Sequence, residues 1–169
     1  MPVLNGYHGT DVHGASLIER YGFQDSSAES WLGPGIYFFE TQPNFDGLEA
    51  ARWWVTTYKK YRNWVILKAE INSTKILDLF ASKEDRAKFN RVKNELLKKH
   101  LESGGDERDF NLKEVFLLFG RKVEVIRSLV DASRLDKFNN FIVGYPQIQI
   151  CVTRSSCIGN LLREEEGVL

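Results

Sequence analysis

The chain has 169 residues, of which 43% are hydrophobic and 27% are charged, and its formal net charge at neutral pH is zero. This composition is typical of one ordinary globular domain, and it excludes attraction of nucleic acid or an acidic membrane through overall charge. The two cysteines, Cys151 and Cys157, are too few for a disulfide framework or a metal site, and they indicate a reducing compartment. The sequence shows neither a signal-peptide pattern nor a membrane-spanning apolar run, so we expect a soluble, cytoplasmic domain without a membrane partner.

The N-terminal part of the chain alternates short strands with helices. A strand is predicted over Leu4–His8 and a helix over Asp11–Tyr21. The compact aromatic run Ile36–Phe39 is typical of a buried strand. A longer helix is then predicted over Leu48–Tyr61, with the pair Trp53–Trp54 in its middle.

The middle of the chain changes from strands to helices. Trp64–Ile71 alternates as a half-buried strand does, and Ile76–Phe80 is another short apolar run. Lys83–Leu101 is highly charged with apolar residues at helical spacing, which predicts an amphipathic helix. Leu112–Phe119 and Val123–Leu135 are predicted to follow as a mixed helical stretch.

Two late strands complete the pattern, over Phe141–Val143 and Gln147–Thr153. On the second strand, Gln147, Gln149 and Cys151 alternate with apolar residues and share one face. Strands at both ends with helices between them predict an α+β fold. We expect one domain over residues 1–169, in which residues 83–135 form a helical and more peripheral insertion.

Four short sequence pieces occur in a definite order: His8-Gly9-Thr10, the AxxIxxxGF spacing of Ala15–Phe23, GPGIYF over Gly33–Phe38, and Ala50–Ala51. In this ordered set the chain resembles the NAD-dependent ADP-ribosyltransferases of the diphtheria-toxin and poly(ADP-ribose) polymerase type. That family carries a His in an HG[ST] strand, a Tyr in a G-x-G-I-Y-F strand and a third residue, usually Glu, on a late strand. The resemblance implies a split-sheet core with NAD between two sheets, no metal, and loss of nicotinamide as ADP-ribose is transferred.

The resemblance also implies roles for particular residues. His8 would hydrogen-bond the ribose 2′-hydroxyl, and Tyr37 would stack on the nicotinamide. Gly9, which lacks a Cβ, would let its backbone approach the carboxamide. Thr10 would supply a hydroxyl at the adenosine side of NAD. Trp53 or Trp54 would supply a second aromatic ring, on the face of the nicotinamide opposite Tyr37.

The third motif residue departs from the family pattern, because Gln149 stands where the Glu is usual and Gln147 is the alternative. A glutamine can accept a hydrogen bond from a ribose hydroxyl but cannot act as a general base. The sequence therefore predicts transfer of a single ADP-ribose rather than chain elongation. A free-standing domain of this kind resembles bacterial toxins and phage-defence effectors, which implies a nucleic-acid or protein acceptor and, as a further partner, a neutralising antitoxin.

Three alternatives stay open. An NAD glycohydrolase would use the same pocket with water as acceptor. An RNA 2′-phosphotransferase would need several basic residues near His8 and Tyr37, where the sequence offers only Arg20 and Arg52. A non-catalytic domain that binds NAD, ADP-ribose or a partner protein would explain the missing Glu.

Other chemically capable residues have simpler interpretations. His13 and His100 are predicted to be surface residues, and Trp31 and Trp64 to be packing residues. The basic run Arg86–His100 predicts a solvated helix face more readily than a nucleic-acid site, because acids dilute it.

Overall fold

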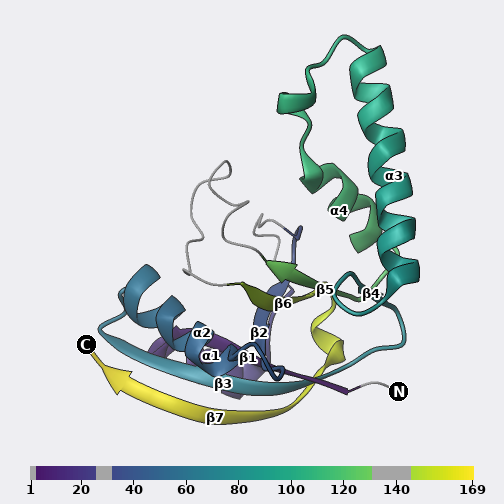
Figure 1. Ribbon diagram of the computed structural model, residues 1–169. Helices are drawn as coiled ribbons and strands as arrows, with labels where there is room; N and C mark the ends of the chain where they lie inside the picture. The colour runs from purple at the N-terminus through teal and green to yellow at the C-terminus, as the bar shows by residue number, and fades with distance from the viewer. Residues whose placement is uncertain (1–2, 26–31, 131–145) are drawn as a thin grey trace.

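The computed structural model describes residues 3–25, 32–130 and 146–169, and the statements below concern these residues. Its strands are β1 (Val3–Asp11), β2 (Ile36–Glu40), β3 (Asn63–Asn72), β4 (Ile76–Asp78), β5 (Val125–Val130), β6 (Gln147–Val152) and β7 (Ile158–Val168). They form one hydrogen-bonded sheet in the order β4-β5-β6-β2-β1-β3-β7, antiparallel except between β4 and β5 (Figure 1).

Helices connect and cover these strands. They are α1 (Val12–Tyr21), α2 (Gly47–Trp53), the π-helical turn η1 (Trp54–Tyr58), α3 (Lys83–Glu102), η2 (Glu107–Asp109), α4 (Leu112–Gly120) and η4 (Ser155–Cys157). The predicted α+β class is thereby confirmed. Among the described residues, the helices are too short or too polar to cross a membrane.

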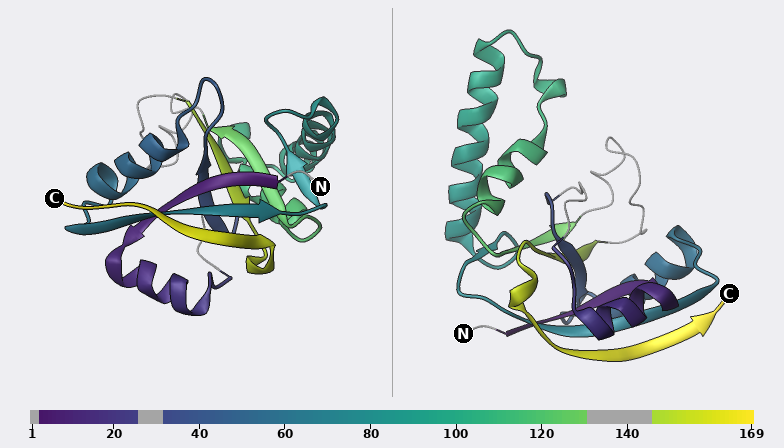
Figure 2. Two further views of the ribbon diagram at one scale, coloured as in Figure 1. Left: turned by 90° about the horizontal axis from the view of Figure 1, so that it is seen from below. Right: turned by 180° about the vertical axis from the view of Figure 1, so that it is seen from behind.

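In the middle of the sheet, β1 and β2 are joined by very few paired residues. β1 pairs with β3 along its whole length, but it pairs with β2 at only two positions, Gly6 with Glu40 and Tyr7 with Phe39. Beyond Tyr7 the two strands separate, while β2 continues along β6 from Glu40 back to Ile36. In Figures 1 and 2, β2 runs between a part made of β1, β3 and β7 and a part made of β4, β5 and β6. His8 is the next residue of β1 after the last paired position, and Tyr37 lies two residues before Phe39 on β2.

The first of these parts is covered on both faces. Ala15 of α1 packs on Val65, whereas Ala51 of α2 packs on the next residue of β3, Ile66. Because successive strand residues point to opposite faces, α1 and α2 cover opposite sides of β3. Ile66 is as fully buried as Val65, so the prediction of a half-buried strand is wrong for this part of β3.

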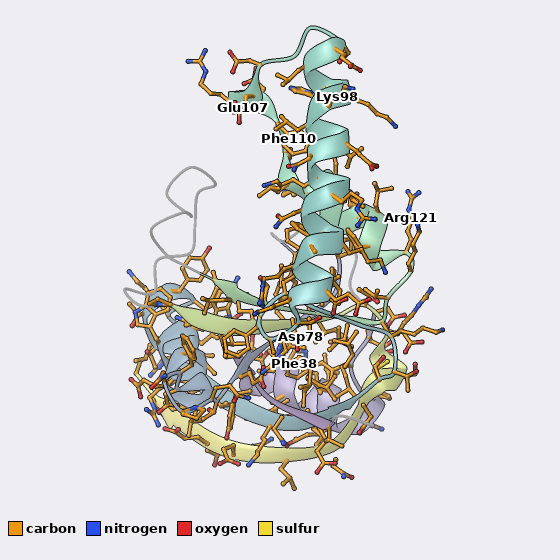
Figure 3. All side chains as sticks on the ribbon, turned by 45° about the vertical axis from the view of Figure 1, so that its right-hand side comes forward. Phe38, Asp78, Lys98, Glu107, Phe110 and Arg121 are labelled. Atoms are coloured by element: carbon orange, nitrogen blue, oxygen red, sulfur yellow. The ribbon has the colours of Figure 1, made fainter. Side chains whose placement is uncertain are left out.

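Helices α3 and α4 project from the other end of the sheet as an arm (Figures 1 and 3). At its base, the rings of Phe89 of α3 and Phe116 of α4 lie 4.9 Å apart at a tilt of 38° and pack with Leu77 and Ile126 of the sheet. Figure 3 shows Lys98 and Glu107 towards its far end. The helices predicted over Lys83–Leu101 and Leu112–Phe119 are confirmed.

Two predictions of secondary structure fail. The helix predicted over Val123–Leu135 is wrong because Val125–Val130 is strand β5, which is buried except at Leu129. Residues 131–135 lie outside the described part. The peripheral helical insertion therefore ends before β5, which belongs to the sheet. The long edge strand β7 was not predicted, since its exposed, glutamate-rich sequence lacks a strand pattern. The predicted strand Phe141–Val143 and the packing residue Trp31 lie outside the described residues.

Candidate functional site

His8 lies where β1 leaves β2, and its ring spans the space between the two strands. Its Nδ1 is 2.9 Å from the carbonyl oxygen of Tyr37. A carbonyl only accepts hydrogen bonds, so Nδ1 must carry the proton and donate. Burial lowers the pKa of His8, and the bond to Tyr37 opposes this only partly. The ring is therefore a neutral imidazole whose Nε2 is an acceptor, and within the described chain no residue donates to this nitrogen.

Aromatic contacts fix the orientation of the His8 ring. Phe23 meets it edge-on at 5.1 Å and 86°, and Phe38 lies at 5.6 Å. Phe23 reaches this position because Gly22, with φ +76°, ends α1 and turns the chain back. The Gly-Phe pair of the sequence motif thus places a ring against His8.

Tyr37 uses its hydroxyl to hold the glycine-rich turn before β2. The hydroxyl donates to the Gly33 carbonyl at 2.7 Å and accepts from the Leu32 N–H at 3.0 Å. Gly33 has φ +95°, and a Cβ on Gly35 would lie 2.8 Å from the Val152 carbonyl oxygen of β6. Both glycines are therefore needed for the turn itself, and the part of Tyr37 suited to a flat ligand is its ring.

Gly9 is explained by packing. A Cβ at this position would lie 2.5 Å from Val55 Cγ1, 3.0 Å from the Ala51 carbonyl oxygen and 3.3 Å from Trp54 Cδ1. Glycine thus lets α2 and η1 approach β1 closely. The predicted approach of a carboxamide to the Gly9 backbone stays a prediction.

The two candidate tryptophans differ in position. Trp54 lies beside Gly9 and 6.5 Å from Phe39, and it stacks on Tyr58 at 4.5 Å with an interplanar angle of 16°. Trp53 stacks on Tyr58 at 6.2 Å. The structure therefore brings Trp54, rather than Trp53, next to the His-Gly strand. Tyr58 was not predicted, although its spacing of four residues from Trp54 on a helix would have indicated the contact.

Thr10 lies at the end of β1 and is half-buried. Asp11 follows it and caps α1, accepting from the Gly14 N–H at 2.6 Å. A Cβ on Gly14 would collide with Thr10 Oγ1, so this hydroxyl packs against the first turn of α1. Its predicted contact with adenosine stays a prediction.

Gln149 shares a face of the sheet with Tyr37. Its Cα is paired with Phe39 of β2, as Cys151 is paired with Tyr37, and alternate residues point the same way. Gln149 is 2% exposed and Gln147 is 5% exposed. Oε1 of Gln147 has no hydrogen-bond partner in the part of the chain that the structure describes. The structure thus puts Tyr37, Gln147 and Gln149 on one face of the sheet, whereas the His8 ring lies against Phe38, whose side chain points to the opposite face. The link between His8 and Tyr37 is the hydrogen bond to the Tyr37 carbonyl.

A buried ion-pair network, not predicted from the sequence, ties down the end of β2. Arg127 of β5 donates to both oxygens of Glu40, at 2.6 and 2.8 Å, and to Asp78 of β4 at 2.9 Å. Burial alone would lower the pKa of Arg127, but its bonds to Glu40 and Asp78 raise it above the usual value. Both oxygens of the Glu40 carboxylate are therefore bound to Arg127, and Glu40 does not replace the missing motif Glu. The signal available in the sequence was a charged residue within each of two apolar runs.

Other candidates are accounted for within the described residues. His13 is exposed, as predicted, and His100 is half-buried with its Nε2 3.0 Å from the Asp106 carbonyl oxygen. Trp64 packs in the core, as predicted. Both cysteines are free and buried, and burial raises the pKa of Cys151 to about 12, which disfavours a thiolate.

Two open hollows of about 540 and 670 Å³ lie at the start of α1 and on the loop before α2. Neither of them is lined by His8, Tyr37 or Gln149. In the described ranges no group of three or more His, Cys, Asp or Glu side chains could hold a metal ion. No protein-family model matches the sequence, and the search of curated proteins finds no significant match.

Proposed function

We propose that this chain is a mono-ADP-ribosyltransferase that moves one ADP-ribose from NAD to a macromolecular acceptor and releases nicotinamide. One observation carries the proposal: His8 is held as a neutral imidazole with Nδ1 on the Tyr37 carbonyl, where β1 and β2 separate. The motif resemblance supplies the chemistry, and this geometry makes His8 an acceptor suited to a sugar hydroxyl. NAD would lie between the two parts of the sheet that β2 joins.

Three residues have separate roles in the proposed reaction. The bond between ribose C1′ and nicotinamide breaks, its electron pair leaves with nicotinamide, and a nucleophile of the acceptor forms the new bond to C1′. His8 Nε2 accepts a hydrogen bond from a ribose hydroxyl and thereby fixes the sugar. This hydrogen bond strengthens as positive charge develops on the ribose. Tyr37 provides the flat surface for the nicotinamide. Gln149 accepts a hydrogen bond from the sugar or the acceptor without removing a proton.

The glutamine limits the acceptor. Since Gln149 carries an amide and the Glu40 carboxylate is bound to Arg127, neither residue supplies a free carboxylate that could deprotonate a hydroxyl. The acceptor must be nucleophilic without such help, or it must carry its own base. Transfer of single ADP-ribose units fits this better than elongation of a chain.

The test is release of nicotinamide from NAD, followed by chromatography, with the protein alone and with RNA, DNA or cell lysate. We expect release that needs one macromolecule and falls about 100-fold or more in His8→Ala and Tyr37→Ala. His13→Ala, an exposed histidine on α1, is the matched control and should keep full activity. Equal activity in the His8 and His13 variants would contradict the proposal.

Two alternatives give different results in the same assay. A glycohydrolase releases nicotinamide at the same rate without any macromolecule. A binding domain releases none, yet binds NAD in calorimetry; the missing motif Glu favours this second alternative. A Gln149→Glu variant that gains activity would further identify this position as the third motif residue.

A further inference from the structure

Residues 52–64 contain a second pattern, in which aromatic and basic residues interleave: RWWVTTYKKYRNW. The segment has four basic residues, Arg52, Lys59, Lys60 and Arg62, and no acid. In the structure it forms the end of α2, the π-helical turn η1 and the link to β3. We call the half-buried rings of Trp53, Trp54 and Tyr58, with the exposed cations Lys59, Lys60 and Arg62, the aromatic–basic turn.

The rings of this turn are ordered in a stack. Tyr58 stacks on Trp54 at 4.5 Å and on Trp53 at 6.2 Å. Lys59 places its Nζ 5.0 Å from the Trp54 ring centre and 5.6 Å from that of Tyr58. Flat rings with cations beside them are the arrangement on which unpaired bases stack.

The cations of the turn are not neutralised by acids. In the described chain, Lys59, Lys60 and Arg62 form no ion pair, whereas Arg52 pairs with Glu165 at 2.7 Å and with Glu49. Asp11, which caps α1, lines a hollow together with Tyr61 and Arg62. All three cations are exposed. Unpaired cations on a chain of zero net charge favour a polyanionic ligand at this place.

The turn adjoins the candidate site. A Cβ on Gly9 would lie 2.5 Å from Val55 and 3.3 Å from Trp54, both residues of η1. The strand that carries His8 therefore packs directly on this turn. Figures 1 and 2 show α2 well apart from the arm of α3 and α4 in every view, so the basic residues of α3 form a separate surface.

We propose that the aromatic–basic turn binds single-stranded nucleic acid and presents it to the site as the acceptor of ADP-ribose. The binding follows from the turn itself, and the acceptor role rests on the proposed function. Lys59, Lys60 and Arg62 contact phosphates, and the Trp53–Tyr58 stack takes an unpaired base. A duplex, whose bases are already stacked on one another, would offer no base to these rings.

The test is fluorescence anisotropy with a labelled 12-nucleotide single strand, as DNA and as RNA, and with the matching duplex, in the absence of NAD. We expect the single strand to bind at least about ten-fold more tightly than the duplex. The triple variant K59E/K60E/R62E should lose at least about ten-fold in affinity and reduce the slope of log affinity against log salt by about 2. Trp53→Ala should lose about ten-fold with an unchanged slope.

The matched control is K88E/R91E/K99E, which reverses three exposed basic residues of α3 that have no ion pair among the described residues. It should leave binding unchanged, and circular dichroism would establish that both triple variants remain folded. Absence of single-strand binding, equal binding of the duplex, or an equal loss in the α3 variant would overturn the inference.

The two proposals can fail separately. His8→Ala should bind the strand normally, because His8 is not part of the turn. Nicotinamide release that depends on a protein acceptor, without strand binding, would refute this inference and leave the proposed function intact. Strand binding without nicotinamide release would do the reverse.

Discussion

His8 is held by contacts that fix both its charge and its tautomer. Phe23 and Phe38 set the plane of the ring, and the Tyr37 carbonyl, 2.9 Å away, requires the proton on Nδ1. Burial lowers the pKa of His8 because it disfavours the charged ring. An imidazole in this state can accept a hydrogen bond through Nε2 at neutral pH and loses this ability once it is protonated.

This account predicts a defined pH dependence. NAD affinity should persist at about pH 6.5, where an ordinary histidine is half protonated, and should fall only as the pH drops through the lowered pKa of His8. Between pH 6.5 and this lowered pKa, the unfolded chain binds more protons than the folded chain. The free energy of unfolding should therefore decrease as the pH falls through that range. Two-bond ¹H–¹⁵N spectra of the histidines would measure both pKa and tautomer. An Nε2-protonated ring, or a pKa of 6.5 or above, would contradict the account.

At the scale of elements, the approach of α2 and η1 to β1 depends on Gly9. A Cβ added at this position would collide with Val55 and press on the Ala51 carbonyl oxygen, and this backbone atom belongs to a helix that cannot move alone. We expect Gly9→Ala to destabilise the fold by about 1–3 kcal/mol, since overpacking displaces the helix. Gly159→Ala on β7 is the control, because a Cβ there meets nothing within 4 Å.

Urea unfolding of the two variants would measure the difference. Equal midpoints for Gly9→Ala and Gly159→Ala would show that β1 and η1 are not in close contact. Because Gly9 also lies in the His-Gly motif, the stability measurement separates its packing role from any contact with NAD.

Elements with a strong local pattern were predictable from the sequence, and elements that depend on distant partners were not. The aromatic run before Glu40 and the apolar run starting at Trp64 predict strands, and these are β2 and β3. β5 was not predicted because Arg127 interrupts its apolar run, and this charge is stabilised by Glu40 and Asp78, which are 87 and 49 residues away in the sequence. β7 was not predicted because it is stabilised by pairing with β3 and its own sequence lacks an alternating apolar pattern.

The candidate site shows the same division. The order of the motif pieces indicates that His8 and Tyr37 lie on neighbouring strands, and β1 and β2 are paired. The bond between His8 Nδ1 and the Tyr37 carbonyl and the packing of Gly9 against η1 are products of the tertiary structure. Sequence spacing carries little information on these contacts.

For the whole molecule, the network around Arg127 links strands from distant parts of the chain. Arg127→Met would leave Glu40, which is 4% exposed, without its partner, and we expect a loss of about 3–5 kcal/mol. Arg163→Met is the matched control, because Arg163 also binds two carboxylates, Glu19 and Glu166, but at the surface. It should cost less than about 1 kcal/mol. Similar losses in urea unfolding of both variants would refute a special role for the buried network.

The central claim is that ADP-ribose is transferred, and the most direct measurement is transfer of label from adenylate-labelled NAD to a macromolecule. The protein would be incubated with labelled NAD and lysate nucleic acid or protein, and retained label would be counted after denaturing separation. The account predicts retained label with the unaltered protein and with His13→Ala, and none with His8→Ala. Free ADP-ribose as the sole labelled product, or label retained equally with His8→Ala, would contradict it.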